Sequence, residues 1–249
     1  LKFISTPFDF ESAKFLNKYC DIIKISSGDN NFFPLLDYFL DKKKKIIIST
    51  GMMSSYDLEE LSKHIKNKLD QKKMLERIAL LHCVTSYPAI DKDLNLNSIP
   101  YLIKNYKFTI GYSDHSIGHE ACISAVALGA KIIEKHFTIN KNFSKFRDHK
   151  LSADFKEMVT IVNGIRKTED QLGEFDKKIL KIEKKILKKV RRGIYAKKNL
   201  KKNQIINEEN IEFFRGSENT DYKYFNNFSG KKLTKNVSKF DLIKKNDLI

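Results

Sequence analysis

Polar side chains gather at three places in this sequence, and their types could bind a divalent metal and an anionic substrate. The clusters are residues 111–116, 134–138 and 148–150, and they include His115 and His136. Imidazoles with acidic, hydroxyl and ammonium groups nearby suit a divalent metal that holds an oxygen-rich anion. A single histidine at a strand end is often a structural hydrogen-bonding residue. Two of them, each in a dense polar cluster, favour a functional site.

Apolar runs precede the first two clusters, so the polar side chains are predicted to emerge where strands end. Residues 108–110 lead into the first cluster and residues 131–133 into the second. Continuous Ile, Leu and Val runs are typical of strands covered on both faces, which indicates a parallel sheet. The carboxyl ends of the strands form the ligand-binding edge of such a sheet. Four upstream runs have the same form, at residues 3–7, 22–29, 46–51 and 78–83.

Helix-like segments separate these runs. Apolar residues recur at three- and four-residue spacing in residues 10–16, 57–65 and 121–128, as in a helix with one buried face. Alternating strands and helices predict right-handed βα units, and the sequence contains six of them. A closed barrel needs eight, and the sequence begins inside a strand-like run. The predicted fold is therefore α/β, a (β/α)8 TIM-type barrel that lacks about its first two units here.

The pattern changes beyond residue 173, which predicts a second domain. Residues 155–172 form the last predicted barrel helix, and Gly173 would cap it. Residues 174–189 are a charged connector, and residues 190–249 contain short extended segments with tight turns. We therefore predict a barrel domain at 1–173, a linker at 174–189 and a small β-rich domain at 190–249. The predicted apolar stripe of the last barrel helix consists of Met158, Val159, Val162, Ile165 and Leu172.

Composition bounds the class of protein. Of the 249 residues 41% are hydrophobic, three are cysteines and the formal net charge is +16. No apolar run is long enough to cross a membrane, and the odd, unspaced cysteines favour a reducing, cytoplasmic compartment. The lysines are spread along the chain and are not interleaved with aromatics, so a solvated basic surface is favoured over a nucleic-acid partner. Cys83 could be a nucleophile, but its apolar neighbours favour a packing thiol.

The motifs of the chain resemble those of the sialic acid synthases, which condense phosphoenolpyruvate with an N-acetylmannosamine-type sugar. The resemblance runs in order along essentially the whole chain, from the third barrel strand to a C-terminal antifreeze-like (SAF) domain, which residues 191–192 and 215–216 match. The barrel motifs are STPF at 5–8, KISSGD at 24–29, STGM at 49–52, HC at 82–83, YP at 87–88, GYSDH at 111–115, EKHFT at 134–138 and DH at 148–149.

This resemblance implies roles for individual residues. The catalytic residues that it implies are His115, His136 and Asp148, and the two histidines would bind Mn²⁺ or Mg²⁺. Thr85 stands where the family has Asn, and Asp29 where Glu is frequent, which leaves the identity of the sugar open. The sugar would be bound by Asp29, Thr85, Tyr87, Asp148 and, in a domain-swapped homodimer, Arg215 of the partner subunit. Phosphoenolpyruvate would be bound by Thr6, Lys24, Ser27, Ser49 and Ser113.

In the implied reaction, C3 of phosphoenolpyruvate attacks the metal-polarised sugar aldehyde, water adds at C2, and phosphate leaves by C–O cleavage. The family's early glutamate and second phosphate-binding lysine lie on the first two strands, so no catalytic base is assigned. A protein confined to these residues is expected to be an inactive fragment.

Several alternatives stay open. Legionaminic or pseudaminic acid synthesis differs only in the sugar, a diacetamido-trideoxyhexose. Another metal aldolase on the same barrel would use the same two histidines. A non-enzymatic carbohydrate- or ice-binding protein is disfavoured, because it gives no role to His115, His136 and Lys24.

Overall fold

The computed structural model describes residues 1–144, 146–216 and 222–249 of the chain. They form two compact units, Leu1–Glu174 and Phe175–Ile249. The division falls one residue beyond the predicted 1–173, and nearly all of the predicted linker belongs to the second unit. Within the described ranges, no helix combines the length and the apolar character needed to cross a membrane.

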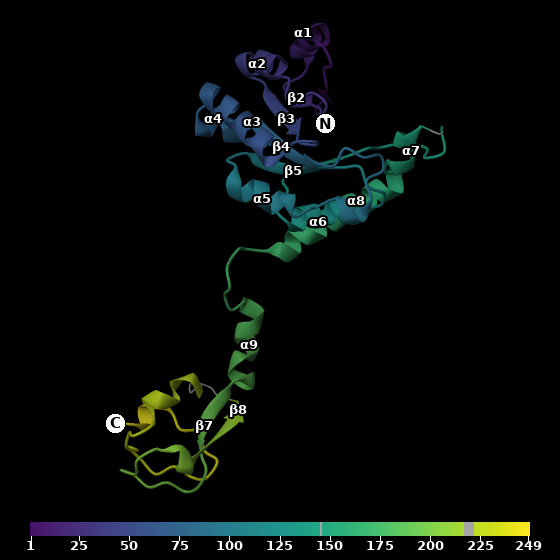
Figure 1. Cartoon of the computed structure of the whole chain (residues 1–249). Coiled ribbons are helices and arrows are strands. Elements are labelled where there is room, and N and C mark those ends of the chain that lie inside the picture. The colour runs from purple at the N-terminus through teal and green to yellow at the C-terminus, as the bar shows by residue number, and fades with distance from the viewer. Residues whose placement is uncertain (145, 217–221) are drawn as a thin grey trace. The chain divides into compact units, whose positions relative to one another are not determined.

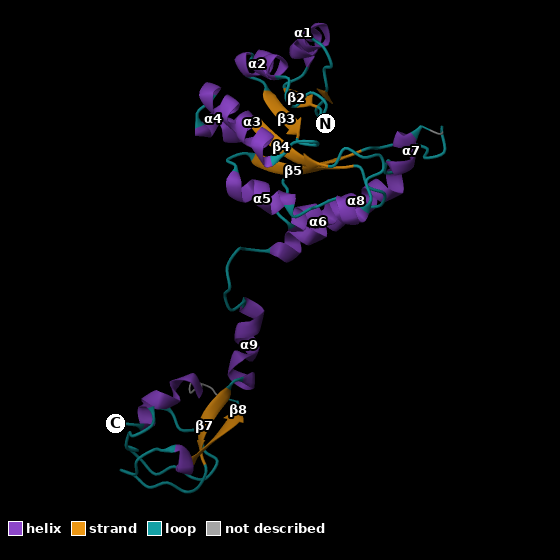
Figure 2. Ribbon diagram, viewed as in Figure 1, coloured by secondary structure: helices purple, strands orange, loops and turns teal. Residues whose placement is uncertain are grey.

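A curled parallel sheet of six strands forms the centre of the first unit (Figures 1 and 2). Each of the six predicted apolar runs overlaps one strand, which confirms the predicted α/β class and the succession of βα units. The strands lie side by side in chain order: β1 (Ile4–Ser5), β2 (Ile22–Ile25), β3 (Lys45–Ser49), β4 (Ile78–Cys83), β5 (Thr109–Asp114) and β6 (Ile133–Lys135).

Helices follow the strands, and side-chain caps set where several of them begin. Ser54 and Asp57 form a capping box at the start of α3 (Ser55–Lys68), and Asp154 and Glu157 form one at the start of α8 (Phe155–Leu172). The helices are α1 (Phe10–Tyr19), α2 (Phe33–Asp41), α3 (Ser55–Lys68), α4 (Gln71–Arg77), α5 (Ser98–Asn105), α6 (Glu120–Ala127), α7 (Arg147–Leu151) and α8 (Phe155–Leu172), with a short 3-10 helix at Asp91–Asp93.

The two faces of the sheet differ in chemistry. Ile23 and Ile25 of β2 belong to the main hydrophobic core with residues of the helices, so this face of the sheet is helix-facing. Because strand side chains alternate, Lys24 lies on the opposite face, which we call the inner face. In the strand register, Lys24 pairs with Ile47, and Ser113 pairs with Glu134. With alternation along each strand, this register places five residues on the inner face: Lys24, Ser49, Cys83, Ser113 and Glu134.

The apolar stripe predicted for α8 is partly wrong. Val159, Val162 and Leu172 are exposed, whereas Ile161, which the prediction omitted, is 2% exposed. Ile161 packs with Ala153, Cys122 and the partly buried Met158 and Ile165. The helix therefore presents a face rotated by about one residue from the predicted one, because α6 lies against it. Gly164 permits that approach, since a Cβ there would come within 2.4 Å of Ile123 Cδ1.

The second unit is small and has its own core. Helix α9 (Lys181–Val190) leads into β7 (Arg192–Ala196), which pairs antiparallel with β8 (Ile211–Arg215). Elsewhere in the predicted β-rich domain, Ile205, Leu242 and Leu248 form isolated bridges instead of ladders, and a 3-10 turn spans Lys245–Asp247. Further 3-10 helices span Glu208–Asn210 and Tyr222–Asn227. The core includes Ile194, Leu200, Ile206, Phe228, Leu233 and Ile243.

The buried carboxylate of Asp247 should make the second unit sensitive to acid. Its Oδ1 lies 2.7 Å from Lys235 Nζ, and its Oδ2 accepts a 2.9 Å hydrogen bond from the Lys244 amide. Burial alone would raise the pKa of Asp247, but these contacts outweigh it and lower the pKa. The stabilisation is therefore present above the unfolded-state pKa of about 3.9 and is lost as the pH falls through the lower folded-state pKa.

We expect Asp247→Asn to weaken the dependence of thermal stability on pH below about pH 4, because the variant has no carboxylate to protonate there. Thermal melts followed by circular dichroism at several pH values measure this. Asp241→Asn, which removes an exposed carboxylate of the same unit, should keep the wild-type dependence. An acid profile of Asp247→Asn identical to that of the wild type would contradict the prediction.

Candidate functional site

The structure brings three predicted site residues together beyond the carboxyl ends of the strands. His115 directly follows β5 and His136 directly follows β6. Their ring centroids are 5.3 Å apart, with the ring planes at 70°. The ring of Tyr87, from the segment that follows β4, lies 4.1 Å from the ring of His115 and 5.9 Å from that of His136.

The hydrogen bond of His115 and the lowered pKa of His136 suit metal ligands, whereas the raised pKa of His115 means that a metal must displace a proton from that ring. His115 Nδ1 lies 2.8 Å from the Val84 carbonyl oxygen, so Nδ1 carries a proton and Nε2 keeps a lone pair. Burial opposes a charge on His115, but its hydrogen bonds with Cys83 and Val84 outweigh this and raise its pKa. Burial, followed by the neighbouring His115, lowers the pKa of His136, which favours the neutral ring that binds metals.

The two rings therefore fit a divalent metal site with open coordination positions. No group of three or more His, Cys, Asp or Glu residues is arranged to hold an ion within the described part of the chain. Oxygen atoms of substrate and water would complete the coordination of a metal bound by His115 and His136.

Lys24 is a largely buried cation of the inner face, and Glu134 is its neighbour. Lys24 Nζ lies 3.3 Å from Glu134 Oε1, and the lysine side chain is 12% exposed. Ser113 Oγ donates a 2.6 Å hydrogen bond to the same carboxylate oxygen. Glu134 is a site residue to which the sequence motifs assign no role. Its alternation with the helix-facing Lys135 was the signal that could have placed it on the inner face.

Cys83 belongs to this polar site and not to the apolar core, which corrects its interpretation as a packing thiol. It is buried and free, and its Sγ lies 3.7 Å from His115 Nδ1. Burial alone would raise the pKa of the thiol, but hydrogen bonds with His115, Ser27 and Ser113 outweigh it and lower the pKa. The thiol thus connects the histidine pair with two of the predicted phosphoenolpyruvate-binding serines.

Hydroxyl groups meet at the end of β3. Ser27 Oγ accepts a 3.1 Å hydrogen bond from the Gly51 amide. A Cβ on Gly51 would lie 2.2 Å from Thr85 Oγ1 and 2.6 Å from Ser27 Oγ, so the close approach of Ser27 and Thr85 requires glycine. Among the described residues, Ser49 Oγ is buried without a hydrogen-bond partner. A buried hydroxyl of this kind is what an anionic ligand would satisfy.

The other predicted site residues are placed as follows. Asp29 Oδ2 accepts a 2.8 Å hydrogen bond from Ser26 Oγ. Thr6 lies just beyond β1 and lines a shallow surface pocket of the first unit. Asp148, in α7, is near enough to His136 for its charge to act on the ring. Arg215 is the last residue of β8 in the second unit, and its side chain is exposed.

Comparisons with known proteins agree with one another. Residues 1–177 match the model of the NeuB family. The chain is 39% identical to N,N'-diacetyllegionaminic acid synthase of Campylobacter jejuni, over 98% of this chain and 72% of that protein. It is 34% identical to pseudaminic acid synthase of the same bacterium, over 98% and 69%. A solved N-acetylneuraminic acid (sialic acid) synthetase from Leptospira borgpetersenii, in complex with citrate, superposes with a TM-score of 0.67 at 35% identity, over 73% of this chain and 62% of that one.

Proposed function

Because this chain belongs to the NeuB family, we propose that it condenses phosphoenolpyruvate with an N-acylated hexosamine to give a nonulosonic acid and phosphate. The names of its relatives, which are legionaminic, pseudaminic and neuraminic acid synthases, support this class of product. One observation carries the proposal: a largely buried lysine and a buried hydroxyl without a partner lie on the inner face of the sheet, and a pair of histidines lies just beyond its strand ends.

The inner face offers the groups that phosphoenolpyruvate requires. A phosphate or carboxylate binds ammonium and hydroxyl donors through charge-assisted hydrogen bonds, and Lys24, Ser27 and Ser49 would supply these donors. Ser113 would supply another when its hydroxyl turns from Glu134 to the anion. Glu134 neutralises Lys24 and would compete with a bound anion for this lysine. The glutamate therefore lowers the affinity of Lys24 for anions. Thr6 completes the proposed set at the end of β1.

The histidine pair is proposed to bind Mn²⁺ or Mg²⁺, which when bound supplies Lewis-acid polarisation of the sugar aldehyde. In the reaction, C3 of phosphoenolpyruvate attacks the aldehyde carbon, water adds at C2 and the phosphate leaves by C–O cleavage. Val84 O holds the tautomer of His115, and Tyr87 packs on its ring, so both fix the ring orientation. Asp29, Thr85, Tyr87 and Asp148 are proposed to bind the sugar.

The architecture proposed for the whole enzyme is that of a (β/α)8 barrel in which β1–β6 are six of the eight strands, followed by an SAF domain. The small core of the second unit and its β7–β8 hairpin support the assignment of residues 190–249 to that domain. Arg215 is proposed to act at the active site of the partner subunit in a homodimer. The three cysteines, all buried and free, support a reducing, cytoplasmic compartment.

Phosphate release from phosphoenolpyruvate tests the proposed function. The purified whole enzyme, with all eight proposed barrel strands, is incubated with phosphoenolpyruvate, Mn²⁺ and one sugar at a time. The sugars are N-acetylmannosamine, a legionaminic acid precursor and a pseudaminic acid precursor, the last two being diacetamido-trideoxyhexoses. Release that depends on one sugar, with a nonulosonic acid detected by mass spectrometry, would support the proposal and identify the substrate. The identity to the legionaminic acid synthase makes its precursor the first to test. Phosphate release that none of the sugars stimulates would contradict the proposed function.

Removing one histidine should abolish metal binding. We expect His136→Ala to raise the Kd for Mn²⁺ at least 100-fold, because one imidazole cannot hold the ion as the pair does. Electron paramagnetic resonance of free Mn²⁺ during a titration measures this. His119→Ala, which removes a histidine outside the site, should bind Mn²⁺ as the wild type does. Equal affinities of His136→Ala and the wild type would exclude the pair as the metal site.

A further inference from the structure

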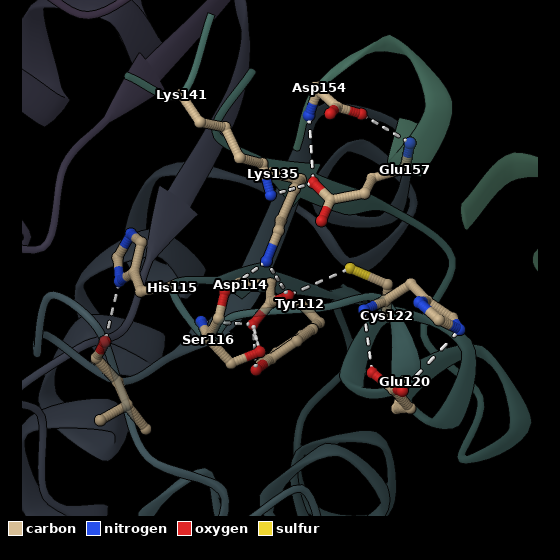
Figure 3. Close-up of polar contacts among 12 residues, drawn as sticks. Tyr112, Asp114, His115, Ser116, Glu120, Cys122, Lys135, Lys141, Asp154 and Glu157 are labelled. Carbon is tan, nitrogen blue, oxygen red and sulfur yellow. Dashed lines mark hydrogen bonds and ion pairs between the residues drawn. The ribbon is translucent and has the colours of Figure 1, made fainter. Parts of the chain in front are cut away.

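A buried ion pair lies on the helix-facing side of the sheet, formed by the residues that immediately precede His115 and His136 (Figure 3 shows it near His115). Lys135 Nζ is 2.7 Å from Asp114 Oδ2, and the two side chains are 3% and 0% exposed. Removing two charges from water costs several kcal/mol per ion, and apolar residues of similar volume often replace such pairs without loss of stability. Stability alone therefore does not explain why charges occupy this position.

The ammonium group of Lys135 holds both flanks of His115. Besides Asp114, it donates a 2.5 Å hydrogen bond to the Ser116 carbonyl oxygen. Asp114 Oδ1 accepts from the amide of Ser116 at 2.9 Å and from its hydroxyl at 2.7 Å. Lys135 thus contacts the residues immediately before and after His115, and it is itself the residue immediately before His136.

The carboxylate of Asp114 is fixed by two further donors, which Figure 3 shows around it. Tyr112 OH donates to Oδ1 at 3.0 Å and Cys122 Sγ to Oδ2 at 3.3 Å. Tyr112 belongs to β5 and Cys122 to α6, so the carboxylate is held by both the sheet and the helix layer. A buried polar network whose members are hydrogen-bonded holds its groups in one arrangement.

The paired ladder of β5 and β6 ends one residue before the two histidines. Asp114 and Lys135 are its last register partners. Beyond them, the His115 carbonyl oxygen accepts from the Ala89 amide at 3.0 Å, and that of His136 accepts from the Ala153 amide at 2.8 Å. These contacts hold each histidine to a different segment, whereas the ion pair links the two strand ends to each other.

We propose that the Asp114–Lys135 pair is a positioning element that sets the separation and orientation of His115 and His136. Its effect on metal affinity rests on the proposed function, whereas its effect on the two strand ends does not. Neither residue touches the substrate, because both lie on the helix-facing side of the sheet.

The double variant Asp114→Asn/Lys135→Met tests this positioning role, since it removes both charges and leaves no buried charge unpaired. We expect its Kd for Mn²⁺ to rise about 10- to 100-fold, the usual effect of losing groups that orient metal ligands. In the metal-free protein, amide hydrogen exchange at Ala89 and Ala153 should accelerate about tenfold, because the contacts that these amides make with the histidine carbonyls loosen. Lys135→Arg, which keeps the charge, should retain most of the affinity.

A matched control separates positioning from general destabilisation. Leu61→Ala removes a fully buried side chain of the same unit and should lower stability while leaving Mn²⁺ affinity unchanged. It should also leave exchange at Ala89 and Ala153 unchanged relative to other amides of the unit. Ser116→Ala, which removes one donor to Asp114, is the milder variant if the double variant does not fold, and its expected loss of affinity is smaller than that of the double variant.

Each outcome decides between the two proposals. The positioning role would be overturned if amide exchange at Ala89 and Ala153 is unchanged in the folded double variant, or in Ser116→Ala if that variant replaces it. This holds whatever the measured affinity for Mn²⁺. Faster exchange together with weaker Mn²⁺ binding would support it. Faster exchange in a protein whose wild type binds no Mn²⁺ would support positioning of the strand ends and contradict the metal site of the proposed function.

Discussion

Lys24→Met should raise the phosphoenolpyruvate concentration needed for half-maximal rate by about 10- to 100-fold. A hydrogen bond from an ammonium group to an anion contributes about 1.5–3 kcal/mol, and each 1.4 kcal/mol corresponds to a factor of ten. The variant also leaves Glu134, which lies 3.3 Å from the lysine, as an unneutralised negative charge facing the substrate. Phosphate-release kinetics at saturating sugar measure the effect.

The fold should tolerate this change, because methionine has a similar length and Lys24 lies outside the main hydrophobic core. Lys63→Met is the matched control, since Lys63 also pairs with a glutamate but is 69% exposed on α3. We expect no change in its phosphoenolpyruvate requirement. An unchanged requirement in Lys24→Met, with a normal circular dichroism spectrum, would show that this lysine does not bind the substrate.

A mixture of Arg215→Ala and His115→Ala subunits should recover activity that neither variant has alone. If Arg215 of the partner subunit completes each site, a mixed dimer contains one site with both residues intact. Helix α9 has ten residues and could span about 15 Å, and the extended residues before it add further reach. Such a closing domain would exclude water and bring a cation to the sugar.

The experiment mixes the two variants, exchanges subunits under mild denaturation and measures sugar-dependent phosphate release. Arg192→Ala provides the control, because Arg192 is the register partner of Arg215 on β7 and has no proposed contact with substrate. Arg192→Ala should be active alone. Two folded variants that stay inactive when mixed would exclude exchange of the second unit between subunits.

The position of Cys83 adds a chemical consequence for these assays. Its Sγ lies 3.7 Å from His115 Nδ1, so oxidation or alkylation of the thiol would place a bulky group beside the histidine pair. Activity measurements on this protein therefore require a reducing agent.

The sequence by itself determined the order of the six strands of the first unit and the places of four of its helices, α1, α3, α6 and α8. Apolar runs such as 22–25 and 78–83 and the helical spacing of 155–172 are local features, and the structure has a strand or a helix at each. The order of the motifs also indicated the family that the comparisons identify. Local composition suffices here because burial on both faces of a strand is recorded in consecutive residues.

Only the tertiary structure decided which side chains meet. The pairing of Ser113 with Glu134, and hence the salt bridge to Lys24, depends on a register between strands that are far apart in sequence. The buried face of α8 depends on how α6 lies against it. The contact of Cys83 with His115 likewise joins two strands. A periodic pattern gives the faces of an element but not its partner, so these features follow from packing and register alone.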